Sequence, residues 1–234
     1  MENFFVVLGG MGTMATESFI HLLNERTPAH RDQDYLNYIV CNHATVPDRT
    51  AYILNESTED PYPALKSDIA SLSTMNPKFF VLTCNTAHYF YDRLQATTSI
   101  PIIHMPRLAA QKVAALAQGK KARVMILATT GTISSKVYHE ELKQYDDLEI
   151  VVPDEYLQTE VMTLIYHDVK EHDFINEERY HRILEKAATD YQCDYMILGC
   201  TELSLMQEKC PNHDYQVIDA QSELVDAVLE NMKK

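Results

Sequence analysis

Two cysteines end apolar runs and are followed at once by polar side chains, a pattern that suits reactive thiols. Cys84 closes the run "FFVLTC" and precedes Asn85 and Thr86, while Cys200 closes "YMILGC" and precedes Thr201. A thiol at the start of a helix lies among backbone N–H groups, and these favour its negatively charged form. Acid–base or nucleophilic chemistry is therefore a candidate at both positions.

A single reactive cysteine would indicate a covalent nucleophile, but a pair of thiols on opposite walls of one site suits a different reaction. One thiolate removes a proton from a carbon atom, and the opposite thiol delivers a proton to the other face of that carbon. The exchange inverts a stereocentre. An unperturbed thiol has a pKa of about 8.5, close enough to neutral pH for both roles.

Two other interpretations of the cysteines stay open. Free cysteine is among the most buried residue types, and a purely structural role suits Cys41 and Cys193. A zinc site would use the helical spacing of Cys84 and His88, but the sequence has neither the CxxC nor the HxxxH pair typical of zinc sites. We therefore expect no metal, and we expect His88 to satisfy a structural hydrogen bond.

Short apolar runs alternate with helical patterns along the whole chain. Most runs are continuously apolar, which is typical of parallel strands covered on both faces. Strands that alternate with amphipathic helices predict an α/β fold with mainly parallel sheets. We expect eight strands, at residues 4–10, 36–41, 79–84, 100–105, 123–130, 148–153, 195–200 and 215–220.

The chain also repeats itself, which predicts two similar halves. Three landmarks recur in the same order with offsets of 119, 116 and 115 residues: "VVLGGMGT" (6–13) with "MILATTGT" (125–132), "VLTCNTA" (81–87) with "ILGCTEL" (197–203), and "PIIHMPRL" (101–108) with "QVIDAQSEL" (216–224). We expect a first α/β domain of residues 1–102 plus 214–234 and a second of residues 103–213. Because ligands bind outside the carboxyl ends of parallel strands, Cys84 and Cys200 are expected to face one cleft between these pseudo-symmetric domains.

Backbone amides and a few cations are the candidates for holding a carboxylate. The turns "GGMGT" (9–13) and "TTGT" (129–132) each follow a predicted strand and expose N–H groups. Arg49, in the loop "VPDRT", offers a guanidinium that can grip a carboxylate with two hydrogen bonds. Both Arg49 and Lys170 would be ordinary solvated side chains if they pointed away from the cleft.

Composition excludes several partners. The formal net charge is −14, from 20 basic and 34 acidic residues, so the overall field repels nucleic acids and anionic membranes. No stretch approaches the roughly 20 apolar residues of a membrane span, and the start of the chain lacks the pattern of a signal peptide. These features predict a cytoplasmic protein, in which the five cysteines are free thiols.

Taken together, the motifs resemble the aspartate/glutamate racemase family of cofactor-independent amino-acid racemases. The resemblance spans nearly the whole chain, and its aspartate racemase branch fits best because Glu202 follows "GCT", where glutamate racemases tend to carry histidine. The motifs are "LGGMGTMAT" (8–16), "PDRT" (47–50), "TCNTAH" (83–88), "LATTGT" (127–132) and "GCTEL" (199–203). The family implies two α/β domains with the active site between them, often a homodimer, and no cofactor, metal or nucleotide.

Carried over position by position, the resemblance assigns a role to each site residue. Cys84 and Cys200 would be the two acid–base thiols. The remaining positions would bind or orient a small acidic amino acid, aspartate in preference to glutamate: Met11, Thr13, Arg49, Asn85, Thr86, Thr130, Lys170 and Thr201. Thr13 departs from the branch, which usually has proline there, and Glu171 stands where the family often has glycine.

Other functions stay open within the same superfamily and outside it. Hydantoin racemases and maleate isomerase share the fold that the resemblance implies, and maleate isomerase uses one cysteine as a nucleophile. Arylmalonate decarboxylases keep only one cysteine, so the pair argues against them. A catalytically silent binding protein that kept the cleft is the alternative from a different class. Exchange of an α-proton in heavy water separates the racemase from the binding protein.

Overall fold

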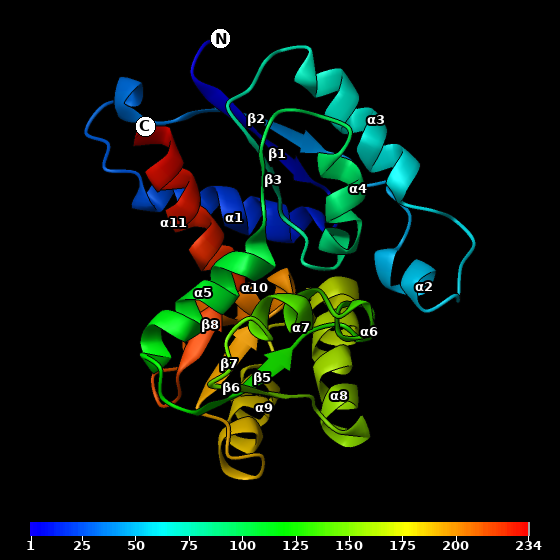
Figure 1. The fold of residues 1–234 in the computed structure, drawn as a ribbon, viewed down its shortest axis with the longest axis vertical. Coiled ribbons are helices and arrows are strands. Elements are labelled where there is room, and N and C mark those ends of the chain that lie inside the picture. Colours follow the sequence, from blue (N-terminus) through cyan, green and yellow to red (C-terminus); the bar gives the residue numbers. More distant parts are fainter. Residues whose placement is uncertain (234) are drawn as a thin grey trace. The chain divides into compact units, whose positions relative to one another are not determined.

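The computed structural model describes residues 1–233, which divide into two compact units (Figure 1). The first unit contains residues 1–105 and takes back the chain at Leu224, and the second contains Pro106–Glu223. All eight predicted strands are present, and each unit has one four-stranded parallel sheet. The predicted α/β fold with two parallel sheets is therefore confirmed.

In the first unit the strand order is β2-β1-β3-β4. The strands are β1 (Phe4–Gly9), β2 (Asn37–Asn42), β3 (Phe80–Leu82) and β4 (Ile102–Ile103). The helices are α1 (Thr13–Arg26), α2 (Arg49–Ile53), α3 (Tyr62–Ser73), α4 (Tyr91–Gln95) and α11 (Ala220–Lys233), with 3₁₀ turns at Asp32–Asp34 and Thr86–Phe90. All six residues of β1 are buried, as the continuously apolar run predicts.

Helices cover both faces of the first sheet. Figure 1 shows α1 and α11 side by side, and the Arg26 guanidinium of α1 lies 2.8 Å from the Asp226 carboxylate of α11. On the other face, Leu65 and Ile69 of α3 and Leu94 of α4 pack in one cluster with the side chains of β1 and β3. Helix α3 follows the helical spacing of its apolar residues Leu65, Ile69 and Leu72.

In the second unit the strand order is β6-β5-β7-β8. The strands are β5 (Ala122–Leu127), β6 (Leu148–Val151), β7 (Tyr195–Leu198) and β8 (Val217–Asp219). The helices are α5 (Met105–Ala117), α6 (Thr130–Ser135), α7 (Val137–Leu142), α8 (Glu155–Met162), α9 (Glu177–Thr189) and α10 (Thr201–Lys209), and a π-helix covers Thr163–Glu171. Apolar side chains of α8, α9 and α10 form one core cluster with β5 and β7.

The register of the strands reproduces the internal repeat. Leu8 pairs with Leu82 in the first sheet, and Leu127 pairs with Leu198 in the second. These four residues are related by the offsets of 119 and 116 that the sequence shows. The third offset recurs as well, because Val81 pairs with Ile103 and Ile197 pairs with Ile218. The two sheets are thus built to one plan, residue for residue.

The domain boundaries differ from those expected. The sequence placed residues 214–234 with the first half, but β8 pairs with β7 and is the edge strand of the second sheet. The chain returns to the first unit only within α11, at Leu224. The internal repeat agrees with the observed boundary. The stretch around Ile218 is the counterpart of β4, so it completes the second sheet rather than the first.

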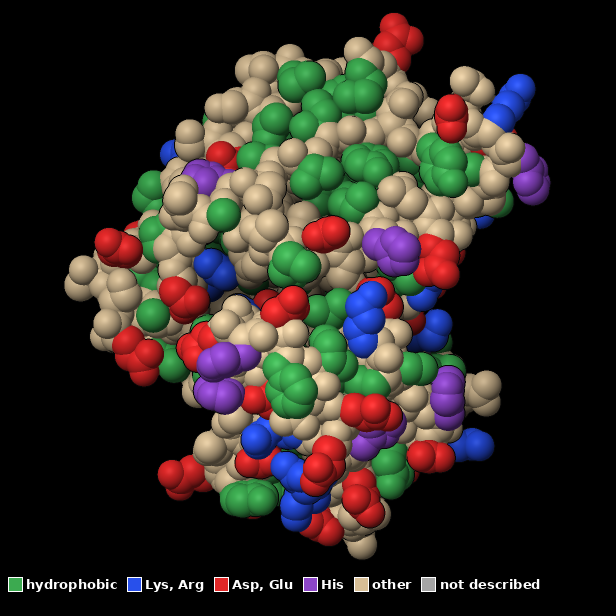
Figure 2. Space-filling model, turned by 180° about the vertical axis from the view of Figure 1, so that it is seen from behind, with side chains coloured by type: hydrophobic (Ala, Val, Ile, Leu, Met, Phe, Trp, Pro, Cys, Tyr) green, Lys and Arg blue, Asp and Glu red, His purple; other side chains and the backbone are tan. Residues whose placement is uncertain are grey.

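Charged side chains of both signs are dispersed over the surface. On the face shown in Figure 2, Lys and Arg side chains lie scattered among Asp and Glu rather than gathered in one patch. Several form ion pairs with acidic neighbours, such as Arg123 with Glu149 and Lys186 with Asp190. Within residues 1–233, no helix combines the length and the apolar character needed to span a bilayer.

Candidate active site

Cys84 lies just beyond the carboxyl end of β3 in the first unit. Its side chain is 5% exposed, and a short 3₁₀ helix begins two residues later, at Thr86. Asn85 and Thr86 are buried beside it. The predicted strand end is confirmed, but the expected α-helix start is a single 3₁₀ turn, because the chain reaches α4 only at Tyr91.

His88 holds this turn in place and has the structural role expected of it. Its Nδ1 lies 2.9 Å from the carbonyl oxygen of Cys84. On the other side of the ring, Nε2 accepts a hydrogen bond from the backbone N–H of Met105 at 3.2 Å. A neutral imidazole that donates through Nδ1 satisfies both contacts. The ring therefore ties the segment after β3 to the segment after β4.

The glycine turn after β1 is a tight strand-to-helix connection, as predicted. Gly10 has a φ of +86°, and a Cβ atom there would lie 2.5 Å from the backbone of His43. The Gly10 N–H donates to Thr16 Oγ1, and that hydroxyl lies 3.1 Å from Thr83 Oγ1, one residue before Cys84. The turn and the Cys84 segment are thus coupled through two threonine hydroxyls.

Arg49 is buried, not solvated, and it binds this same turn. Its side chain donates to the carbonyl oxygen of Met11 at 2.8 Å and to those of Pro47 and Val46 at 3.1 and 3.3 Å. Arg49 begins α2, which is capped by the Asp48 carboxylate. Met11 is buried as well. The structure therefore brings Met11 and Arg49 together, whereas Thr13 lies exposed at the start of α1.

Cys200 lies at the carboxyl end of β7 and is the N-cap residue of α10. Cys200 is 6% exposed. Its thiol donates to the Glu202 carboxylate, with 2.8 Å between Sγ and Oε2. Thr201, also predicted, is buried in the first turn, and its hydroxyl lies 3.4 Å from the same oxygen.

The electrostatics at Cys200 differ from those expected at a helix start. Burial and the negative charge of Glu202 raise the pKa of the Cys200 thiol well above its usual value, and the positive charge of Lys170 only partly opposes this. The amides at the helix start favour the thiolate, but the carboxylate two residues away opposes it. In this unit the thiol is therefore the favoured form of Cys200.

Lys170 reaches the Cys200 segment through Glu202. Its ammonium lies 3.5 Å from Glu202 Oε1 and 4.6 Å from the centre of the Tyr166 ring. Lys170 belongs to the π-helix Thr163–Glu171, a helix type that is rare and frequent at functional sites. The buried Asp168 anchors this segment to α9 by accepting hydrogen bonds from Asn176 and Arg179.

The turn after β5 is the counterpart of the glycine turn. Thr129 caps α6 by accepting a hydrogen bond from the Thr132 N–H at 3.2 Å. Thr130 is half-buried, and its backbone N–H points at Met162 Sδ, 3.3 Å away. Gln158 donates to the Ala128 carbonyl at 2.9 Å, which holds α8 against the turn. Thr130 also lines a surface hollow with side chains of α8 and the π-helix.

Sequence reasoning missed three side chains at these positions. Glu202 was used only to choose a branch of the family, although its contact with Cys200 follows from a helix N-terminus that turns residue i+2 back toward the N-cap. Gln158 carried no motif. Tyr138 is fully buried, its ring would lie 3.0 Å from a Cβ atom at Gly199, and the charge of Cys200 contributes to its raised pKa, after burial and Asp219.

The other cysteines fit the structural role. Burial raises the pKa of Cys193 to about 11, and burial likewise raises that of Cys210 to about 11. Neither ends a strand that opens onto a turn. Cys41 lies on the edge strand β2 and is partly exposed. Among residues 1–233, no three His, Cys, Asp or Glu side chains are grouped so that they could hold a metal ion.

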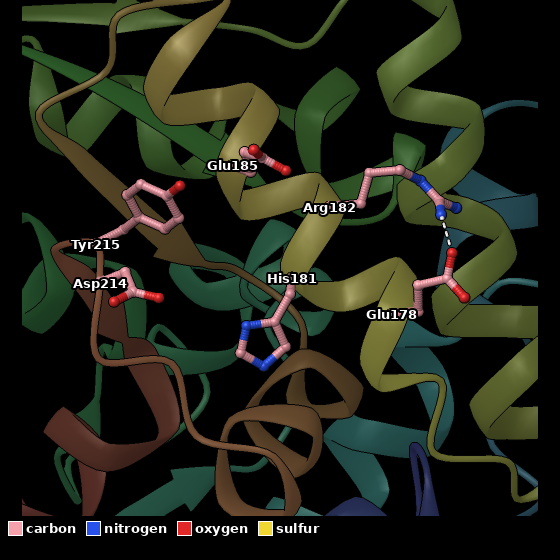
Figure 3. Close-up of a pocket in the computed structure, with 6 residues that line it drawn as sticks. All are labelled: Glu178, His181, Arg182, Glu185, Asp214 and Tyr215. Atoms are coloured by element: carbon pink, nitrogen blue, oxygen red, sulfur yellow. Dashed lines mark hydrogen bonds and ion pairs between the residues drawn. The ribbon is translucent and has the colours of Figure 1, made fainter.

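A second hollow of the second unit contains none of the predicted residues. Figure 3 shows its lining, in which α9 contributes the Arg182 and Glu178 side chains that pair with each other. His181 of α9 points toward the segment that carries Asp214 and Tyr215. The charged side chains of this hollow are those of an exposed helix face, and no thiol lies among the residues that line it.

The fold and the thiols define an α/β protein of duplicated architecture, with one buried cysteine after the third strand of each sheet. Residues 8–228 match the sequence profile described as Asp/Glu/Hydantoin racemase. The match covers most of the chain, and the chain therefore belongs to the Asp/Glu/hydantoin racemase family.

Curated relatives include glutamate racemases and a racemase of broader specificity. A glutamate racemase of Staphylococcus carnosus is 30% identical over 184 residues, which are 73% of this chain and 65% of the relative. A broad specificity amino-acid racemase of Bacillus subtilis is 24% identical over 204 residues, 85% of each chain. The chain spans less of the glutamate racemases, 65% and 63% of the first two.

Among solved structures, the chain is similar to an aspartate racemase of Picrophilus torridus. The two share 29% sequence identity with a TM-score of 0.82, over 99% of this chain and 94% of the other. A glutamate racemase of Francisella tularensis solved with D-glutamate aligns with a TM-score of 0.65 over 98% of this chain and 81% of the other. At 20% identity, that second likeness shows the fold alone.

Proposed function

We propose that the protein is a cofactor-independent racemase of acidic amino acids, with aspartate preferred over glutamate. The observation that carries the proposal is the equivalence of Cys84 and Cys200. Each lies two residues beyond a leucine that pairs with the first strand of its unit, Leu82 with β1 and Leu198 with β5. Membership of the family and the likeness to an aspartate racemase support the reaction class.

In the proposed reaction the two thiols act on opposite faces of the substrate α-carbon. The thiolate of one cysteine takes the α-proton, and the C–H electron pair stays on the carbon as a carbanion. The thiol of the other cysteine gives its proton to the opposite face, which leaves that cysteine as the thiolate. The enzyme takes up one proton and releases one, so no added acid or base is needed. After each turnover the thiol and the thiolate have exchanged places between the two cysteines.

Stabilisation of the carbanion is the demanding part of this reaction, and fixed dipoles would supply it. Arg49 lies against the glycine turn with its guanidinium already held by three carbonyl oxygens. A substrate carboxylate would accept from the N–H groups of Arg49 that point away from these oxygens. The N-termini of α1 and α6 follow the two turns and add backbone N–H groups of favourable sign.

Asn85, Thr86 and Thr201 would orient the substrate, because they flank the thiols and their side chains are buried. Met11, Thr13 and Thr130 would line the site beside the turns. Lys170 would bind a substrate carboxylate while its ammonium also pairs with the Glu202 carboxylate. We also propose that the protein works in the cytoplasm and that it is a homodimer. Sedimentation analysis would test the oligomeric state.

One alternative function has a specific observation in its favour. In a maleate-isomerase-like enzyme one cysteine would be a nucleophile, and the hydrogen bond between Cys200 and Glu202 distinguishes one of the two thiols. Such an enzyme would interconvert unsaturated diacids and leave amino acids unchanged. A hydantoin racemase would act on a cyclic hydantoin. A silent binding protein would catalyse no reaction.

Incubation with substrate in heavy water tests the proposal. L-Aspartate and L-glutamate are supplied separately, and the α-proton is followed by NMR while chiral chromatography follows the D-enantiomer. Loss of the α-proton together with formation of D-aspartate is the expected result. Maleate and hydantoins are supplied in parallel arms. Turnover of maleate or a hydantoin without any exchange of an amino-acid proton would contradict the proposed function.

A further inference from the structure

The Cys200 thiol is engaged by a buried carboxylate of its own unit, and this contact deepens the proposed function. Glu202 Oε2 lies 2.8 Å from Cys200 Sγ, close for a contact to sulfur, and Glu202 is 4% exposed. Both residues belong to the second unit, on the first turn of one helix. The contact therefore depends only on local backbone geometry.

A carboxylate beside a thiol acts on the proton between them. Glu202 accepts a hydrogen bond from the Cys200 thiol. It would repel the Cys200 thiolate, because two negative charges at this distance cannot both be well solvated in a buried site. Lys170 pairs with the other carboxylate oxygen of Glu202 at 3.5 Å. The three side chains thus form a chain from thiol to carboxylate to ammonium.

The remaining charged or titratable groups around Cys200 do not substitute for Glu202. Tyr138 of α7 lies against Gly199, and burial, Asp219 and Cys200 together raise its pKa, so it stays a neutral phenol. Asp219 is occupied by the Ser204 hydroxyl, which donates to it at 2.6 Å. Burial and Glu202 are the two largest causes of the raised pKa of Cys200.

We propose that Glu202 is a positioning residue that holds a proton on Cys200, so that the resting enzyme carries Cys200 as the proton-donating thiol. This assignment rests on the proposed racemase. In the resting form Cys84 takes the α-proton and Cys200 gives its own proton to the carbanion. Repulsion between Glu202 and the new Cys200 thiolate promotes the return of a proton to Cys200, from solvent or from the α-carbon of the opposite enantiomer.

Direct titration of the Cys200 thiol tests this role without reference to activity. Thiolate absorbance near 240 nm is recorded against pH for the protein and for Cys200→Ser, and the difference reports Cys200. The same pair of spectra is recorded in the Glu202→Gln background. The glutamine is of similar size but has no charge, and its amide can donate to a thiolate. We expect the Cys200 midpoint to fall by about one pH unit or more.

Lys170→Gln supplies a second variant with the opposite expected sign. Removal of the ammonium leaves the Glu202 charge unopposed, so the Cys200 midpoint should rise. A loss of packing would not shift the midpoint in opposite directions in the two variants. Glu208→Gln is the matched control, because it also removes one carboxylate from α10 but at the far end, beside Lys209. It should leave the midpoint unchanged.

The pH profile of racemisation gives the second readout. The profile of kcat/KM should be bell-shaped, and its alkaline limb reports loss of the last proton from the thiol pair. That limb should move to lower pH in Glu202→Gln, in step with the titration. Racemisation has an equilibrium constant of one, so kcat/KM is equal for the two enantiomers. The preference for the Cys200 thiol over its thiolate therefore appears as unequal kcat values for the two enantiomers, compensated by unequal KM values.

The possible results separate the two proposals. A Cys200 midpoint that is the same in the protein, in Glu202→Gln and in Lys170→Gln would overturn the role of Glu202, whatever the activity. A shifted midpoint in a protein that racemises no amino acid would uphold the thiol–carboxylate contact and reject the proposed function. If Glu202→Gln fails to fold by circular dichroism, Lys170→Gln alone decides, and an unshifted or lowered midpoint there overturns the proposal.

Discussion

At the scale of single residues, the two thiols are the side chains on which the proposed activity depends. Each is buried at a strand end, where a small side chain can replace it without emptying a large volume of core. Cys84→Ala and Cys200→Ala should each lower racemisation by at least about 10²-fold, the range for loss of a positioned acid or base. Chiral chromatography measures the rate, and thermal unfolding checks the fold.

Cys193→Ala is the control for these two substitutions. It removes an equally buried thiol from the same unit as Cys200. Cys193, however, precedes strand β7 and does not lie at the carboxyl end of a strand. Its racemisation rate should match that of the unchanged protein. If Cys84→Ala kept the full rate, the two-thiol mechanism would be wrong, even if Cys200→Ala were inactive.

Arg49 is expected to act on both stability and binding. Its guanidinium satisfies the carbonyl oxygens of Met11, Val46 and Pro47, so Arg49→Ala leaves buried acceptors without this donor and should cost about 1–3 kcal/mol of unfolding free energy. Arg49→Lys keeps the charge but loses the planar fork. We expect Arg49→Lys to fold well and to raise KM for aspartate at least about tenfold. An unchanged KM in Arg49→Lys would show that Arg49 only supports the turn.

At the scale of elements, the turn after β1 depends on Gly10. A side chain there would need a positive φ and would meet the backbone of His43 at 2.5 Å. Gly10→Ala should therefore destabilise the protein by roughly 3 kcal/mol or more, through strain and displacement of the turn. Gly119→Ala is the matched control: its φ is +74°, but its Cβ would meet only Asp147, at 3.9 Å. Its cost should stay near 1–2 kcal/mol.

Urea unfolding of the two variants, followed by circular dichroism, makes the comparison. The difference in unfolding free energy between Gly10→Ala and Gly119→Ala isolates the steric part, because both replacements place alanine at a positive φ. Equal losses in the two variants would mean that the turn adapts and that its close approach to His43 is not a constraint.

The π-helix that carries Lys170 is held by Asp168. Burial disfavours the charged form of this carboxylate, but contacts with His167, Asn176 and Arg179 outweigh burial and lower its pKa below the usual value. A lowered folded-state pKa stabilises the protein above the unfolded-state pKa of about 3.9 and loses that contribution as pH falls through the folded-state value. Asp168 should therefore support folding at neutral pH and not near pH 2.

Asp168→Asn tests this pH dependence. The variant should be less stable than the unchanged protein by about 1–3 kcal/mol at pH 7, and the difference should shrink as the pH is lowered below about 4. Asp190→Asn, which removes an exposed partner of Lys186, should change stability by less than about 0.5 kcal/mol. A deficit in Asp168→Asn that is the same at pH 7 and pH 2.5 would contradict a role for the ionised carboxylate.

At the scale of the whole molecule, much of the fold followed from the sequence because two signals agreed. Apolar runs gave the eight strands, and the repeat predicted which strand of one half corresponds to which strand of the other. The pairs Leu8–Leu82 and Leu127–Leu198 follow that correspondence in register. The domain boundary was misplaced because no break in composition marks the passage of the chain within α11.

The candidate site was predictable only where a motif carried it. Cys84, Cys200 and the glycine turn stood out by type and spacing. The contacts of Glu202, Arg49 and Gln158 did not, because they depend on how side chains turn within a few ångströms and on which carbonyl oxygens remain to be satisfied. Such contacts follow from the packed backbone, and the sequence pattern alone does not contain them.

The net charge of −14 bears on substrate choice. A dicarboxylic amino acid gains nothing from the overall field and needs local anchors, such as Arg49 and the N-termini that follow the two turns. One methylene is worth about 1–3 kcal/mol of discrimination, so L-glutamate should be racemised about 10- to 200-fold more slowly than L-aspartate. L-Alanine should fail because it leaves a buried cation without its carboxylate. Equal turnover of alanine and aspartate would show that the side-chain carboxylate of the substrate has no anchor in the site.

The measurement that tests the central claim most directly is the isotope content of both enantiomers early in the reaction. L-Aspartate is incubated with the protein in heavy water, the reaction is stopped before a tenth has reacted, and the separated enantiomers are analysed by mass spectrometry. Two thiols acting on opposite faces predict deuterium in the D-aspartate formed and ordinary hydrogen in the L-aspartate that remains. Deuterium appearing equally early in the remaining L-aspartate would show that a single base serves both faces, and would contradict the paired roles of Cys84 and Cys200.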